Sequence, residues 1–131
     1  MTWTVWIDGW QMQCCGADFV PGDLVSWTLL EVEPEDYADI VGGERADEID
    51  FREEHHGQEE GHTPTSVEVV SIAAVHCRYE VSPGASDKVS HPVPGSTVLV
   101  PVEKADGRAD PRTGVRFAGY LVTVRRTAEV P

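Results

Sequence analysis

The sequence has little of what membrane, secreted and nucleic-acid-binding proteins need. Its 131 residues include three cysteines, and ten Lys and Arg stand against 23 Asp and Glu, a formal net charge of −13. No window approaches the run of about 18 apolar residues that a membrane helix requires, and the N-terminus has no basic or apolar region of a signal peptide. Nucleic acids and anionic lipids bind clustered positive charge. We therefore expect a cytoplasmic protein that binds neither nucleic acid nor membrane.

Cysteine is scarce, and its positions fit no common zinc site. An odd count cannot close a complete set of disulfides, and Cys14 and Cys15 are adjacent, whereas zinc ligands are usually two to four residues apart. His76 and Cys77 are also adjacent, and on a strand their side chains point to opposite faces. These positions predict a buried Cys77, loop cysteines without a catalytic role, and no structural metal or other cofactor.

Alternating apolar and polar residues predict an all-β, mainly antiparallel fold for a single domain over residues 1–131. The strand pattern covers residues 2–10, 24–33, 65–81, 96–104 and 115–124, and a short helix pattern covers 34–41. Pro101 has no N–H for a ladder, which places its strand at a sheet edge. The apolar phase slips by one residue at Gly119, which predicts a β-bulge. These features favour a small barrel or sandwich, and the resemblance of residues 22–25 to the turn before a strand in such domains implies an SH3-like or OB-like form.

Negative charge is concentrated in one segment. Residues 31–60 contain thirteen Asp and Glu against Arg45 and Arg52, whereas the rest of the chain is close to neutral, with ten acids and eight bases. High charge and low hydrophobicity disfavour a packed structure. We therefore expect residues 44–62 to form a mobile acidic loop that contributes little to folding and acts in association with a basic surface.

Three histidines in that loop are a candidate metal site. His55, His56 and His62 lie among four glutamates, and imidazole and carboxylate groups bind divalent ions. However, Gly57 and Gly61 make the segment flexible, and a specific site needs partners that fix its ligands. A solvated acidic loop is the favoured interpretation.

Trp6, Asp8 and Trp10 are a candidate binding face, because alternate residues of a strand lie on one side of it. Aromatic side chains on such a face provide rigid contact area. The alternative is that the tryptophans fill the core, where this residue type is usually found.

The sequence contains no recognisable catalytic motif. It has no nucleophile elbow, phosphate-binding glycine loop, His-Glu-x-x-His or spaced Cys-x-x-Cys pattern. The leading hypothesis is a non-enzymatic β-barrel module that binds a protein partner or forms a homo-oligomer. The alternative is a metal-binding or hydrolytic small-molecule enzyme that uses His and acidic side chains.

The N-terminal stretch Trp3-Thr4-Val5-Trp6-Ile7-Asp8-Gly9-Trp10, followed by Cys14-Cys15-Gly16 and Pro21-Gly22-Asp23-Leu24-Val25-Ser26-Trp27, resembles an uncharacterised family of small actinobacterial proteins. The resemblance covers roughly the first 30 residues and implies no activity. The basic residues are eight Arg and two Lys, a bias that accompanies GC-rich genomes. Separately, Gly22-Asp23-Leu24-Val25 resembles the turn before a strand in SH3-like and OB-like domains.

Overall fold

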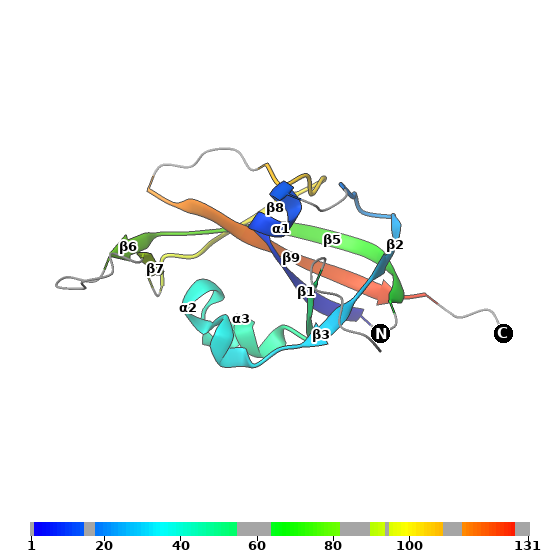
Figure 1. The fold of residues 1–131 in the computed structure, drawn as a ribbon, viewed down its shortest axis with the longest axis horizontal. Coiled ribbons are helices and arrows are strands. Elements are labelled where there is room, and N and C mark those ends of the chain that lie inside the picture. The colour runs from blue at the N-terminus through cyan, green and yellow to red at the C-terminus, as the bar shows by residue number, and fades with distance from the viewer. Residues whose placement is uncertain are drawn as a thin grey trace.

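The computed structural model describes residues 2–14, 18–54, 64–81, 90–93, 95–108 and 114–127, and this part of the chain is predominantly β (Figure 1). The strands are β1 (Thr2–Asp8), β2 (Leu24–Trp27), β3 (Leu29–Glu31), β4 (Phe51–Glu53), β5 (Thr65–Cys77), β6 (Tyr79–Val81), β7 (Ser90–Pro92), β8 (Val98–Val102) and β9 (Arg116–Arg126). The helical segments are α1 (Gly9–Cys14), η1 (Pro34–Asp36), α2 (Ala38–Val41) and α3 (Gly43–Glu48). The all-β prediction is confirmed.

The main sheet is mixed and curls into a half-barrel. Its strand order is β2-β5-β9-β1-β4-β3, with β8 paired to β5 beside β2, and β6 and β7 form a separate pair. Strand β1 runs parallel to β4, while the other pairs are antiparallel. Only Thr28 separates β2 from β3, so one short stretch of chain connects the two ends of the sheet and keeps it curled. The parallel pair is the departure from a purely antiparallel arrangement.

The bulge in β9 and the edge position of β8 both occur where the sequence predicted them. Between Val75 and His76 of β5, the partner on β9 changes from Gly119 to Phe117, which leaves one extra residue on β9. The predicted bulge is therefore confirmed. A Cβ at Gly119 would lie 2.4 Å from the carbonyl oxygen of Ile7, so the glycine also permits the close approach of β1. Strand β8, which contains Pro101, pairs only with β5 among the described strands, as an edge strand does.

Buried side chains form two clusters on the two faces of the curled sheet. The larger cluster lies inside the curl and is built from alternate residues of the long strands, among them Val5, Ile7, Val67, Val69, Val122 and Val124. The smaller cluster lies between the outer face of the sheet and the segment from η1 to α3. It contains Trp6, Tyr37, Val41, Ala46, Ile49 and Val75. Strand β1 contributes to both clusters because its successive side chains point to opposite faces.

The first expected strand is shorter than its pattern. Strand β1 ends at Asp8, and Gly9–Cys14 forms α1, where the sequence predicted two further strand residues and a loop. A Cβ at Gly9 would lie 2.7 Å from the Phe117 ring, so glycine allows the chain to turn tightly against β9. Met12 then enters the inner cluster with 4% of its surface exposed, and its burial stabilises a helix too short to be stable alone.

The prediction of a mobile acidic loop is wrong over its first half. The segment contains α3 and β4, and Ala46 and Ile49 are buried against the sheet. The segment has few apolar residues, but those few lie on one side, so tertiary contacts override its polar composition. Residues 55–63 lie outside the described part of the chain. The expected helix over 34–41 corresponds to η1 and α2.

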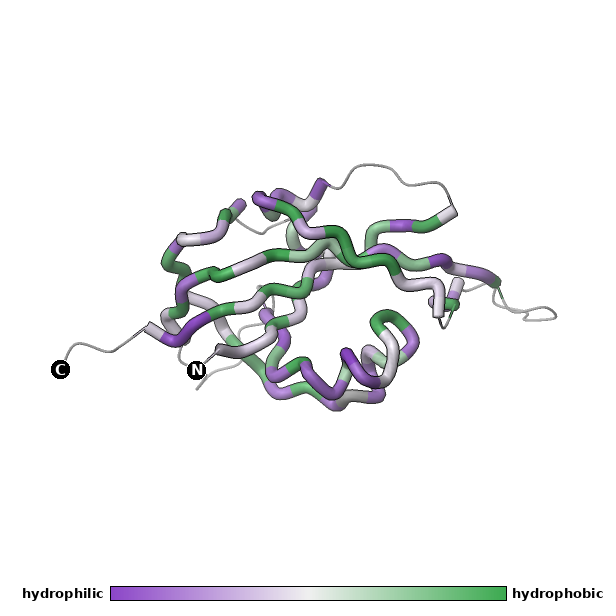
Figure 2. Tube along the Cα trace, turned by 180° about the vertical axis from the view of Figure 1, so that it is seen from behind, coloured by the Kyte–Doolittle hydropathy of each residue, from purple (hydrophilic) through white to green (hydrophobic). Residues whose placement is uncertain are grey.

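Residues 33–50, here called the acidic cover, lie against one side of the sheet. Figure 1 shows α2 and α3 together below the strands, and Figure 2 shows hydrophobic and hydrophilic stretches alternating along them. Two polar contacts add to the apolar packing: Thr97 Oγ1 donates to the carbonyl oxygen of Ile40, and the Thr4 amide donates to Asp50 Oδ2 over 2.9 Å. These contacts join α2 to the residue before β8 and the C-terminal end of the cover to β1.

Among the described residues, no helix has both the length and the apolar character to cross a membrane.

Candidate functional site

A groove of about 340 Å³ lies on the outer face of the sheet beside α3. Two rows of cross-strand neighbours line its floor. One row consists of Thr4, Thr123 and Ser71 from β1, β9 and β5, and the other consists of Leu121, Ala73 and Pro101 from β9, β5 and β8. Most of these side chains are short, which leaves space for a ligand on this part of the sheet.

Arg45 and Glu48 of α3 form one wall of the groove. The remaining cover residues make the surroundings of this wall strongly negative. The exposed carboxylates of the cover are those of Glu33, Glu35, Asp36, Asp39, Glu44, Asp47, Glu48 and Asp50. Arg45 is the one cation in residues 33–50, so the cover has a balance of eight negative charges to one positive.

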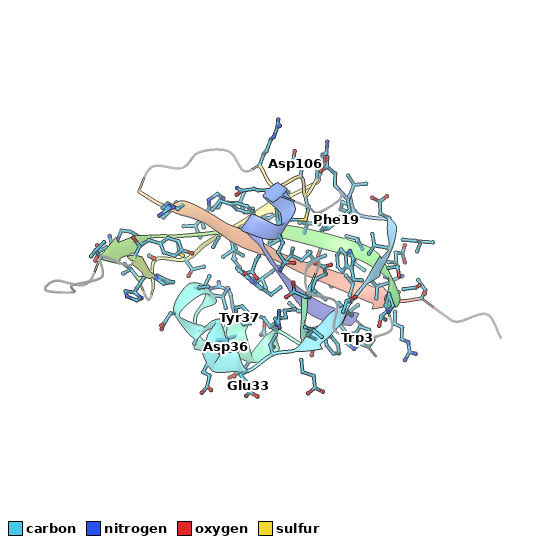
Figure 3. The ribbon with its side chains drawn as sticks, viewed as in Figure 1. Trp3, Phe19, Glu33, Asp36, Tyr37 and Asp106 are labelled. Atoms are coloured by element: carbon cyan, nitrogen blue, oxygen red, sulfur yellow. The ribbon has the colours of Figure 1, made fainter. Side chains whose placement is uncertain are left out.

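The orientation of the cover exposes these carboxylates. Tyr37 is 8% exposed and packs on Trp6 with 5.4 Å between ring centroids, while Glu33 and Asp36 face outward (Figure 3). Arg45 Nη1 donates to the carbonyl oxygen of Val41 over 3.4 Å, so part of its guanidinium is engaged by its own helical segment. The surface beside the groove therefore favours positively charged ligands.

A second cavity, also of about 340 Å³, lies where α1 begins. It is lined by Gly9, Gln13, Tyr79, Ser90, Arg116, Phe117 and Ala118. The Arg116 guanidinium lies over the Tyr79 ring, 5.4 Å from its centroid. Burial, followed by the interaction with the Cys77 thiol, raises the pKa of Tyr79 to about 12. Tyr79 therefore stays a neutral phenol at physiological pH.

The structure brings Trp6 and Asp8 together but not as an open binding face. Trp6 is 1% exposed, and its Nε1 donates to Asp8 Oδ1 over 2.8 Å. Trp10 belongs to α1 rather than to β1, so the prediction that the three residues share a strand face is wrong. The helix begins at Gly9, which ends the alternation on which that prediction rested. Trp6 takes the core position that the alternative interpretation gave it.

Gln11 and Glu53 are buried polar residues that the sequence patterns did not single out. Gln11 is 0% exposed, and its Nε2 donates to the Glu53 carbonyl oxygen over 3.3 Å and to Asp8 Oδ2 over 3.4 Å. Glu53 is 3% exposed. Burial, with a smaller contribution from the charge of Glu54, raises the pKa of Glu53 to about 8. These contacts connect α1 to β1 and β4, which is a structural role.

Of the metal ligands that the sequence suggested or excluded, the structure describes Cys77 but not the three histidines. His55, His56 and His62 lie outside the described residues. Cys77 is buried, as predicted, and burial raises its pKa, which disfavours the reactive thiolate. Within the described ranges, no three His, Cys, Asp or Glu side chains are grouped to hold a metal ion.

Comparison with known proteins identifies a family but no activity. A model described as a family of unknown function (DUF6578) matches residues 1–126, so the chain belongs to this family. No curated protein and no solved structure matches significantly. The match covers far more of the chain than its first 30 residues.

Proposed function

We propose that the protein is a non-enzymatic module that binds an extended, basic segment of a protein partner in the groove beside α3. The observation that carries this proposal is the position of the groove, whose short-side-chain floor adjoins a cover with eight exposed carboxylates and a single cation. A groove of about 340 Å³ is within the range of roughly 300–1,000 Å³ that ligand sites occupy.

The chemistry of the groove suits a peptide with alternating apolar and basic residues. Leu121, Ala73 and Pro101 provide apolar contacts for one face of an extended chain, and the hydroxyls of Thr4, Ser71 and Thr123 can hydrogen-bond its backbone. Basic side chains that point toward α3 would meet Glu48, which shares this wall with Arg45, and the carboxylates of the cover, which outnumber that cation eight to one. Charge complementarity of this kind speeds association and selects partners.

The same charge argues against self-association through this face. Two copies would bring two acidic covers together, and like-charged surfaces brought together disfavour a complex by several kcal/mol. A basic partner is therefore preferred to a homo-oligomer. We further infer a cytoplasmic, actinobacterial setting, which the free Cys77 thiol and the Arg-rich basic residues support.

Fluorescence anisotropy with a labelled peptide of four Lys-Val repeats tests this proposal. We expect binding that weakens as salt rises, because screening shortens the reach of the charges. Reversing one rim charge with Glu48→Lys should weaken binding about fivefold, since an exposed ion pair contributes up to about 1 kcal/mol. Filling the floor with Ala73→Phe should weaken it at least as much.

Glu80→Lys is the matched control, because it makes the same charge reversal at an exposed carboxylate of β6 that does not line the groove. It should bind the peptide as the unaltered protein does. A peptide of Glu-Val repeats should not bind. Equal binding of both peptides, or no effect of Glu48→Lys and Ala73→Phe, would contradict the proposal.

A further inference from the structure

The cavity beside α1 has a cation for which the described part of the chain provides no carboxylate. Arg116 is exposed, lines this cavity and forms no ion pair among the described residues. Its contact is the face of the Tyr79 ring. The guanidinium has five N–H donors in a planar fork that suits a carboxylate. The chain as a whole has a net charge of −13. The Arg116 guanidinium nevertheless makes this cavity a place where a negatively charged ligand is favoured.

The walls of the cavity suit a flat, apolar body. Tyr79 and Phe117 provide aromatic surface on the lining. The Phe117 ring packs against the His76 ring at 5.9 Å and the Tyr120 ring at 5.0 Å between centroids. The Arg116 guanidinium lies over the Tyr79 ring, 5.4 Å from its centroid. Rings fixed in this way provide contact area that loses little conformational freedom when a ligand binds.

The remaining lining residues give polar contacts and space. Gln13 and Ser90 line the cavity, and Gln13 Nε2 donates to the carbonyl oxygen of Gly107 over 3.2 Å. This hydrogen bond fixes the amide, whose oxygen is an acceptor. Gly9 also lines the cavity, and a Cβ there would displace the Phe117 ring. The position of that aromatic wall therefore depends on glycine at the start of α1.

We propose that this cavity binds a small aromatic carboxylate, whose carboxylate accepts hydrogen bonds from Arg116 and whose ring packs against Tyr79 and Phe117. Its volume of about 340 Å³ fits a ligand of one or two rings. The site shares no lining residue with the groove beside α3, so it is independent of the proposed peptide binding.

Titration with benzoate, benzamide and benzylamine, followed by amide NMR, tests the proposal with three probes of nearly equal shape and different charge. Benzoate should bind most tightly and should shift the amide signals of Gly9, Gln13 and Ala118. The variant Arg116→Gln should weaken benzoate binding by about tenfold or more, because a charge-assisted hydrogen bond is lost. Its benzamide binding should change little, which separates loss of the charge from loss of the cavity.

Arg125→Gln is the matched control, since Arg125 is an exposed arginine of β9 that does not line this cavity. It should bind benzoate as the unaltered protein does, and equal thermal stability of both variants would verify their folding. Benzylamine or benzamide binding as tightly as benzoate would overturn the proposal. Unchanged benzoate affinity in Arg116→Gln, or signal shifts located at other residues, would also overturn it.

Discussion

Replacement of Trp6 by alanine is expected to lower the free energy of unfolding by about 3 to 5 kcal/mol, the range for removal of a large buried aromatic side chain. Trp6 is 1% exposed and stands between the sheet and the acidic cover, where it packs on Tyr37. A Cβ at Gly119 would lie 2.8 Å from its ring, so the indole also fills the space above the β9 glycine. Its removal leaves a cavity that backbone on both sides prevents from closing.

Loss of a hydrogen bond should also contribute to the lower free energy of unfolding of Trp6→Ala. Trp6 Nε1 donates to Asp8 Oδ1, and a half-buried carboxylate that loses a donor destabilises the folded state. Trp6→Phe keeps much of the packing but not this donor, so we expect a smaller loss than for Trp6→Ala. Urea unfolding followed by circular dichroism measures both differences.

Leu24→Ala is the control for the Trp6 variants. Leu24 is 73% exposed on β2, so its truncation should change the free energy of unfolding by no more than about 0.5 kcal/mol. A loss for Trp6→Ala as small as that for Leu24→Ala would mean that the cover does not pack on Trp6.

The second expected result is a pH-dependent difference between the unaltered protein and Glu53→Gln. Burial raises the pKa of Glu53 from 4.5 to about 8, so near neutral pH the folded protein holds a proton that the unfolded chain releases. The unfolded state then binds fewer protons, and stability falls as pH rises. The contribution is fully present below pH 4.5 and is lost as pH rises to about 8.

The slope of this loss cannot exceed about 1.4 kcal/mol per pH unit for one group. Over the whole interval the difference between the two proteins should change by up to about 4 kcal/mol. Glutamine has a similar size and stays neutral, so Glu53→Gln should lack this slope and be the more stable protein at pH 8. Denaturant unfolding at pH 5, 6, 7 and 8 measures the difference.

Glu44→Gln serves as the control, since Glu44 is an exposed carboxylate of α3. Its stability should follow that of the unaltered protein across this pH range. Parallel curves for Glu53→Gln and the unaltered protein would mean that Glu53 ionises in the folded state as easily as in the unfolded chain.

The sequence predicted those parts of the fold that depend on local pattern. Period-two alternation located β5, β8 and β9, and the phase slip at Gly119 located the bulge. The prediction that β8 lies at a sheet edge is correct, because Pro101 has no N–H to donate to a neighbouring strand. These features follow from residues close together in the chain.

The parts that were missed depend on contacts between distant residues. The patterns of α1 and α3 are too short and too polar to indicate helices, and both helices exist because Met12, Ala46 and Ile49 are buried against the sheet. Glu53 looked like one member of an acidic run, and only the pairing of β4 with β1 shows that it is buried. The groove and the cavity beside α1 likewise join residues from four or more elements.

The central claim is that the acidic cover is a fixed part of the fold that holds its carboxylates beside the groove, and native-state hydrogen exchange tests it most directly. The amides of Val41, Gly42, Ala46 and Asp50 donate to backbone carbonyls of the cover or of β1 over 2.9 Å. We predict that these amides exchange slowly, with protection approaching that of the β5 amides, because opening the cover would expose Trp6 and Ile49. Exchange at the rate of an unstructured chain would contradict the claim and would mean that the cover is a mobile loop.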